Sequence, residues 1–288
     1  MKQIANEVQQ KLKELIAERP ESDKGKRLFD AMRYSSERGK RLRPYLLVKT
    51  ADLFNVDKEK SLRAGCALEM IHCFSLIHDD LPAIDNDDLR RGFKTCHKQF
   101  DEPTAILAGD GLLASAFAVL SDPQTHPKAE IRIKLVDLYA KSAMGMIEGE
   151  FIDILADHGE RFNLQEISHM QNLKTGCLIS CAAIAGAILG NASEKETAAL
   201  RNYSLDIGLA FQIADDILDV VGDEKKVGKA LRKDAKAGKA TFVSLLGLDG
   251  ARKKEREIID HAINELFIFG EKSDKLVELA KFIIERDK

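Results

Sequence analysis

The sequence predicts an all-α fold, a single domain over residues 1–288 with about ten to thirteen helices. Apolar residues recur with helical spacing along almost the whole chain. Only 6 prolines and 19 glycines interrupt the 288 residues, which leaves room for long helices. No series of short alternating segments joined by Asn-Gly or Asp-Gly turns indicates a sheet. Since no linker rich in Gly, Ser or Pro separates two halves, we expect one domain.

The apolar pattern also places the individual helices. The first stripe runs from Ile4 to Ile16, with charged residues on the opposite face. Later helical patterns cover Ala129–Leu155, Leu173–Leu189 and Leu205–Val221. Prolines and polar clusters divide the helices at Pro20, Pro44, Pro103 and residues 122–127, 158–163 and 190–194.

Composition excludes several classes of protein. Lys and Arg number 44 against 47 Asp and Glu, and the net charge of −3 argues against a general nucleic-acid binder. No apolar run is long enough to predict a membrane span, and no export signal is visible, so we expect a cytoplasmic protein. The 5 cysteines form no Cys-x-x-Cys pair and are interpreted as reduced thiols in the core.

A first cluster of carboxylates follows a run that is apolar enough to be buried. Asp79, Asp80 and Asp85 come directly after residues 70–77. Buried carboxylates are costly unless they are paired or bind a metal. Asp79 and Asp85 lie about 240° apart on an ideal helix, so they converge only if the helix is distorted between them. Pro82 supplies a physical cause for that distortion.

A second cluster contains Asp215, Asp216 and Asp219, after the apolar run 207–214. Asp215 and Asp219 are four residues apart and share one helix face. Oxygen ligands without clustered Cys or His favour a hard ion such as Mg²⁺, completed by water and substrate phosphates. The two clusters therefore predict a site for a metal-bound polyphosphate.

Basic residues accompany both clusters. Arg90 and Arg91 follow the first, and the segment Gly39–Pro44 precedes it. Lys229 and Lys239 follow the second, within a polar stretch, residues 222–240, that we expect to become ordered when substrate binds. Such a mixed set suits one diphosphate bridged by Mg²⁺ and another bound directly by Arg and Lys. If Arg90 and Arg91 are neighbours on a helix, they point about 100° apart and can serve different diphosphates.

Taken together, these motifs resemble those of the trans-isoprenyl diphosphate synthases, and most closely the bacterial farnesyl diphosphate synthases. The likeness covers nearly the whole chain. The motifs that carry it are GKRLRP at Gly39–Pro44, ALEMIHCFSLIHDDLPAIDNDDLRRG at Ala67–Gly92, TAILAGD at Thr104–Asp110, KTG at Lys174–Gly176 and FQIADDILDVVGD at Phe211–Asp223.

The resemblance implies a bundle of helices around a deep central cavity, usually in a homodimer. It also implies a role for each matching residue. Asp79, Asp85 and Asp215 would bind three Mg²⁺ ions, or Mn²⁺, with Asp80 and Asp219 in support. Residues implied to contact the allylic diphosphate are Arg90, Lys174, Lys229 and Lys239. Residues implied to bind isopentenyl diphosphate are Lys40, Arg43, His72 and Arg91. Thr175 and Gln212 match positions that place oxygens near the developing allylic cation.

The activity implied is condensation of dimethylallyl or geranyl diphosphate with isopentenyl diphosphate to farnesyl diphosphate. The alternatives are a geranylgeranyl diphosphate synthase and, from another class, a non-catalytic regulatory subunit of a prenyltransferase. The basic residues at positions 40, 43 and 91 argue against a terpene cyclase, which needs no second diphosphate site. One departure from the family pattern is Glu150, where many relatives have Gln, and it is expected to add negative charge near the bound diphosphate.

Phe74 is predicted to limit the length of the product. It precedes Asp79 by five residues, about 7.5 Å along a helix, and so lies deeper than the first metal ligand. A growing prenyl chain whose diphosphate is bound at Asp79 would meet the phenyl ring. Tightly packed side chains move little to make room for further growth. The alternative is that Phe74 is an ordinary core residue.

Overall fold

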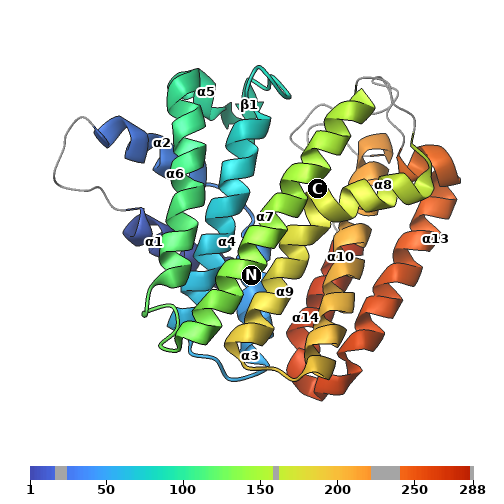
Figure 1. The fold of residues 1–288 in the computed structure, drawn as a ribbon. Helices are drawn as coiled ribbons and strands as arrows, with labels where there is room; N and C mark the ends of the chain where they lie inside the picture. Colours follow the sequence, from blue (N-terminus) through green and yellow to red (C-terminus); the bar gives the residue numbers. More distant parts are fainter. Residues whose placement is uncertain (17–24, 158–161, 222–240, 286–288) are drawn as a thin grey trace. The chain divides into compact units, whose positions relative to one another are not determined.

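The computed structural model describes residues 1–16, 25–157, 162–221 and 241–285, and these are mostly helical (Figure 1). This confirms the all-α class, and the number of described helices agrees with the expected range. Two compact units are distinguished by their contacts. The first contains residues 1–140 and 188–190, and the second contains residues 141–187 and 191–288. The sequence-based assignment of one domain stays a prediction.

The first unit is built around a central helix. Its elements, in chain order, are α1 (Lys2–Leu15), α2 (Lys26–Ser36), α3 (Leu42–Asp52), α4 (Lys58–Asp79), β1 (Leu89–Arg90), β2 (Phe93–Lys94), α5 (Cys96–Gln99), α6 (Glu102–Ser121) and the start of α7 (Ala129–Asp157). Helix α4 begins where the Asp57 side chain accepts hydrogen bonds from two free backbone N–H groups. It is buried on most sides and packs against α3 and α6. Its last turn is therefore held firmly, which matters because it carries the first aspartates.

The second unit contains the rest of α7 and the helices that follow. These are α8 (Leu164–Gln171), η2 (Asn172–Gly176), α9 (Cys177–Leu189), α10 (Glu194–Val221), α13 (Phe242–Glu265), η3 (Leu266–Ser273) and α14 (Asp274–Glu285). Helices α10 and α13 lie side by side, as Figure 1 shows, and the buried Tyr203 hydroxyl ties α10 to α14 by donating to the Leu276 carbonyl at 2.7 Å. The segment η2 is one turn of π-helix between α8 and α9, a form of helix often found at functional sites.

Two observations bear on the core. The five cysteines are free thiols, as predicted, and burial raises the pKa of the Cys73 thiol to about 12.

By length and hydropathy alone, two stretches of described helix could cross a membrane, Glu102–Ser121 and Leu164–Leu189. The sequence pattern had indicated none. The second stretch is mostly buried, as expected of a core helix.

Candidate active site

The first aspartate cluster lies where α4 ends. Asp79 is the last residue of the helix, and residues 81–86 form turns. The Asp85 N–H donates to the Asp79 carbonyl at 2.9 Å, and the Asn86 N–H donates to the Leu81 carbonyl at 3.1 Å. The backbones of the two aspartates are thus brought together by a helix that ends rather than by one that bends, and the convergence of their carboxylates stays a prediction. Pro82 lies in the turn, where its lack of an N–H does no harm.

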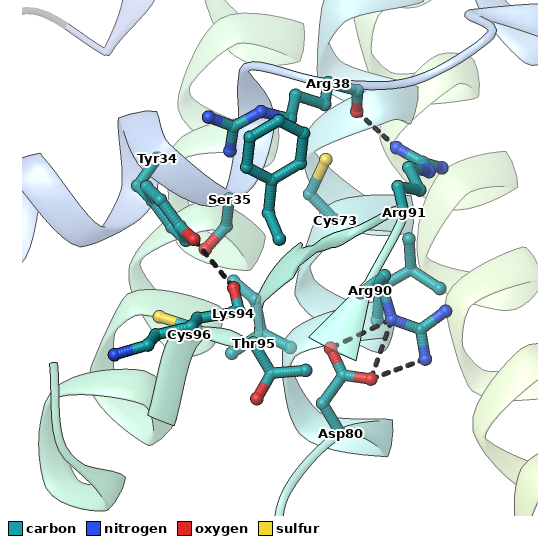
Figure 2. A pocket seen from close by; sticks show the side chains of 13 residues that line it. Tyr34, Ser35, Arg38, Cys73, Asp80, Arg90, Arg91, Lys94, Thr95 and Cys96 are labelled. Atoms are coloured by element: carbon teal, nitrogen blue, oxygen red, sulfur yellow. Dashed lines mark hydrogen bonds and ion pairs between the residues drawn. The ribbon is translucent and has the colours of Figure 1, made fainter. Parts of the chain in front are cut away.

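Asp80 has a different environment from its neighbours, because its side chain is bound to Arg90. The Arg90 Nε donates to both carboxylate oxygens, at 2.7 and 2.9 Å, and its Nη2 lies 2.5 Å from Oδ1 (Figure 2). Asp80 is buried, which raises its pKa, while the hydrogen bonds and charge of Arg90 oppose that rise. The pair fixes Arg90 against the end of α4.

Arg90 and Arg91 lie on a short β-hairpin, so the expectation that they are neighbours on a helix is wrong. Arg90 is in strand β1 and pairs with Phe93 of β2, while Arg91 begins the turn in the left-handed conformation, with φ 54°. Their side chains still diverge. The Arg91 Nη1 donates to the Arg38 carbonyl, whereas Arg90 turns to Asp80 (Figure 2).

The hairpin is attached to α2 and to the aspartate turn. The Arg38 guanidinium lies over the Phe93 ring, 3.6 Å from its centre, and the Tyr34 hydroxyl donates to the Lys94 carbonyl at 2.7 Å. The Thr95 hydroxyl donates to the Asp87 carbonyl at 2.8 Å. These residues line a small pocket that also contains Asp80, Arg90 and Arg91 (Figure 2). The pocket therefore joins the aspartate turn to a cluster of cations.

Further cations surround His72, which directly precedes the pocket residue Cys73 on α4. Burial lowers the pKa of His72 well below its usual value, and the charges of Arg43, Arg91, Arg90 and Arg41 lower it further. His72 is therefore neutral at neutral pH. Lys40 is exposed, and burial also lowers the pKa of Arg43. This concentration of positive charge around a neutral imidazole favours binding of an anion.

A buried ion pair under this cluster was not found from the sequence. Arg41 donates to Glu69 at 2.6 Å, and both side chains are almost completely buried. Arg41 has a left-handed φ of 54° and also donates to the Ser36 carbonyl and to Gln9. The pair holds the start of α3, which carries Arg43 and is preceded by Lys40. Its signal in the sequence is a glutamate in the middle of the apolar run of α4.

Phe74 lies where the sequence placed it, one turn before the end of α4, and it is buried. Its ring contacts the ring of His78 edge to face, with 4.8 Å between the centroids. His78 in turn lies 3.1 Å from the Ile106 carbonyl of α6, and a Cβ at Gly109 would overlap its ring. The Phe74 ring is therefore held in place by a histidine that cannot easily move.

In the second unit, η2 presents the predicted Lys174 and Thr175. The Gln212 Nε2 on α10 donates to the Thr175 hydroxyl at 2.9 Å. The Lys174 ammonium lies 2.6 Å from Asp153 and 2.8 Å from Glu150, both on α7. Burial acts to lower the pKa of Lys174, but the two carboxylates outweigh it and raise the pKa. Gly149 permits this approach, because a Cβ there would overlap the Lys174 backbone.

Asp215 and Asp219 lie in the last turns of α10, as predicted, and Asp219 is buried. Asp216, between them, has a structural role that the sequence did not reveal. Its carboxylate accepts a hydrogen bond of 2.7 Å from the backbone N–H of Phe242 and so satisfies the first turn of α13. Lys229, Lys239 and the rest of the stretch 222–240 lie outside the described residues.

Among the described residues, no group of three Asp, Glu, His or Cys side chains is close enough to hold a metal ion. The carboxylates present still fit Mg²⁺, which is usually bound through one or two carboxylates, with water and substrate phosphates as its other ligands. Asp79 and Asp85, which are joined by a hydrogen bond between their backbones, supply such a pair.

Comparison with known proteins gives a consistent result. The family model described as polyprenyl synthetase matches residues 25–280. The chain is 41% identical to a farnesyl diphosphate synthase of Micrococcus luteus, over 91% of this chain and 90% of the relative. It is 40% identical to a geranylgeranyl diphosphate synthase of Cyanophora paradoxa, over 90% of this chain and 88% of the relative. A crystal structure of an FPP/GFPP synthase from Zymomonas mobilis matches with a TM-score of 0.89 and 43% identity, covering 98% and 96% of the two chains.

Proposed function

Because the chain belongs to the polyprenyl synthetase family and is a prenyltransferase that makes prenyl diphosphates, we propose that its product is farnesyl diphosphate. The substrates in this proposal are isopentenyl diphosphate and either dimethylallyl or geranyl diphosphate. The observation that carries the proposal is the turn from Asp79 to Asp85, which lies next to the ion pair of Asp80 with Arg90. Carboxylates for a hard cation and arginines for phosphate oxygens are the groups that two diphosphate substrates require.

The metal ligands in this proposal are Asp79, Asp85 and Asp215, with Asp80 and Asp219 in support, for three Mg²⁺ ions that Mn²⁺ could replace. When bound, Mg²⁺ supplies Lewis-acid neutralisation of the leaving diphosphate. Asp80 supports the site indirectly, because its carboxylate is committed to Arg90. Asp219 is buried, and it follows Asp215 by one helical turn on the same face of α10.

The basic residues divide between the two substrates. Those proposed to bind the allylic diphosphate are Arg90, Lys174, Lys229 and Lys239. Those proposed to bind isopentenyl diphosphate are Lys40, Arg43, His72 and Arg91. Neutral His72 contributes a hydrogen bond rather than a charge, since its surroundings keep it unprotonated.

The chemistry proceeds by ionisation, condensation and elimination. The carbon–oxygen bond of the allylic diphosphate breaks, and the electron pair leaves with the diphosphate. The double bond of isopentenyl diphosphate then attacks the allylic cation, and a proton is lost to the departed diphosphate. Thr175 and Gln212, which are hydrogen-bonded to each other, direct oxygens toward the cation. The reaction needs no strong nucleophile from the protein, in agreement with the residues present.

Fifteen carbons is the proposed product length because Phe74 is a buried aromatic side chain with a fixed neighbour. Relatives named as farnesyl and as geranylgeranyl synthases have nearly the same identity to this chain, so the choice rests on this residue. The support of the Phe74 ring by His78, and of His78 by α6, makes it a firm limit to chain growth.

A cytoplasmic homodimer completes the proposal. Helix α6 has a mean hydropathy of 1.6 over its most apolar window, yet only 39% of that window is buried. Leu107 is 57% exposed, and Ile106, Ala114 and Ala118 are exposed with it. A second copy of the chain would cover this apolar face. The apolar character of α6 is then explained by a protein partner rather than by a membrane.

Metal removal and return tests this function. Purified protein is treated with a chelator and given isopentenyl and dimethylallyl diphosphates, and release of inorganic pyrophosphate is followed. We expect no release until Mg²⁺ is added, and none when either substrate is omitted. Release without isopentenyl diphosphate would indicate hydrolysis of the allylic diphosphate instead. Absence of release under all conditions would favour a non-catalytic subunit.

A further inference from the structure

The ion-pair triad of Glu150, Asp153 and Lys174 places two carboxylates on one ammonium group. One ammonium lies between two carboxylates, at 2.8 Å from Glu150 and 2.6 Å from Asp153. All three side chains are largely buried, so water screens their charges only in part. Glu150 and Asp153 therefore share the N–H donors of a single lysine.

The arrangement is rigid. Gly149 lets α7 approach η2 so closely that a Cβ would overlap the Lys174 backbone, which fixes Glu150 next to the lysine. A lysine ammonium has three N–H donors. Asp153 and Glu150 each engage one of them, so the oxygens of another anion have fewer donors to bind.

We propose that Glu150 weakens the binding of diphosphate by Lys174 and so favours its release. The inference rests on the proposed function, in which Lys174 contacts the allylic diphosphate. Glu150 acts by competing with phosphate oxygens for the N–H donors of Lys174. Glu150 is thus a positioning residue that acts through the lysine, not a catalytic residue.

The test is direct measurement of binding. The probe is inorganic pyrophosphate in the presence of Mg²⁺, titrated calorimetrically into the full-length protein. Glu150→Gln keeps the shape of the side chain and removes its charge, so we expect pyrophosphate to bind about fivefold more tightly. The matched control is Glu148→Gln, which makes the same change at an exposed position on the same helix and should leave the affinity unchanged.

A double variant shows whether the effect passes through the lysine. In a Lys174→Ala background, Glu150→Gln should give little or no gain in affinity. The idea is overturned if Glu150→Gln binds pyrophosphate no more tightly than the parent protein. It is also overturned if the full gain persists without Lys174, because Glu150 would then act on the ligand by itself.

Steady-state kinetics separates this inference from the proposed function. Glu150→Gln should lower the KM for the allylic substrate several-fold and should not raise kcat, while the KM for isopentenyl diphosphate stays the same. If the parent protein forms prenyl product and the variant shows no such change, only the inference fails. If the parent protein forms no prenyl product at all, the proposed function fails instead.

Discussion

The backbone N–H of Asp85 donates a hydrogen bond of 2.9 Å to the backbone carbonyl of Asp79, the last residue of α4. This bond closes the turn after the helix and sets the first and last aspartates of the cluster side by side. The bond joins two backbone groups, so the main chain itself closes the turn that carries these aspartates.

Alanine variants of the proposed metal ligands should fold but lose nearly all turnover. Asp79→Ala and Asp215→Ala remove carboxylates from the ends of helices that are held by other contacts. We expect thermal unfolding to change by only a few degrees and prenyl transfer at saturating Mg²⁺ to fall by several orders of magnitude. Turnover within tenfold of the parent enzyme in either variant would contradict their role as metal ligands.

Arg90 and Arg91 should affect different substrates. Arg90 is bound to Asp80 and Arg91 to the Arg38 carbonyl, on a hairpin that directs them apart. Arg91→Ala should raise the KM for isopentenyl diphosphate more than that for the allylic substrate, and Arg90→Ala should do the reverse. Steady-state kinetics with each substrate varied in turn measures both. Equal increases for both substrates in the two variants would rule out this division.

Phe74→Ala should lengthen the product to twenty carbons or more. Removal of the buried ring opens space beside His78, while the aspartates at the end of α4 remain in place. Chromatography of the products measures the change, and the Mg²⁺ requirement should persist as an internal control. A variant that still makes only the fifteen-carbon product would show that another residue sets the length.

Gly149→Ala should destabilise the protein, since the added methyl group would overlap the backbone of η2 at Lys174. We expect a loss of about 1–3 kcal/mol in the free energy of unfolding, measured with denaturant. Gly250→Ala in α13 is the matched control, because its Cβ would meet only the side chain of Leu246. Equal stability of the two variants would mean that α7 does not approach η2 so closely.

His72 should make the protein sensitive to acid. Its pKa is lowered in the folded state by burial and by the surrounding arginines, so the unfolded chain binds a proton more readily. Stability that is present above about pH 6.5 is then lost as the pH falls, by at most about 1.4 kcal/mol per pH unit. His72→Asn should lose less stability than the parent protein between pH 7 and pH 5, as measured by denaturant unfolding. A parallel decline in both proteins would show that His72 has an ordinary pKa.

Much of this structure could be predicted from the sequence, because both helix formation and carboxylate clustering are local signals. The helical spacing located α1, α7, α9 and α10. The four-residue spacing of Asp215 and Asp219 placed them on one helix face. What could not be predicted depended on partners far along the chain. The ion pair of Arg41 with Glu69 and the hydrogen bond from Phe242 to Asp216 each join residues that are more than twenty positions apart.

The hairpin at Arg90 and Arg91 was mistaken for helix for a related reason. Two-residue strands are too short to show an alternating pattern, and the turn depends on a left-handed arginine followed by Gly92 at φ 79°. Only the glycine is visible in the sequence as a signal for such a turn. The attachments that hold the hairpin, from Tyr34 and Arg38, come from α2.

Product sizing tests the central claim most directly. The purified protein is incubated with Mg²⁺, isopentenyl diphosphate and geranyl diphosphate, and the products are dephosphorylated and separated by chain length. We predict that the fifteen-carbon alcohol is the main product and that it does not form without Mg²⁺. A main product of twenty carbons would contradict the assignment of product length, and the absence of any elongated product would contradict the proposed enzyme activity itself.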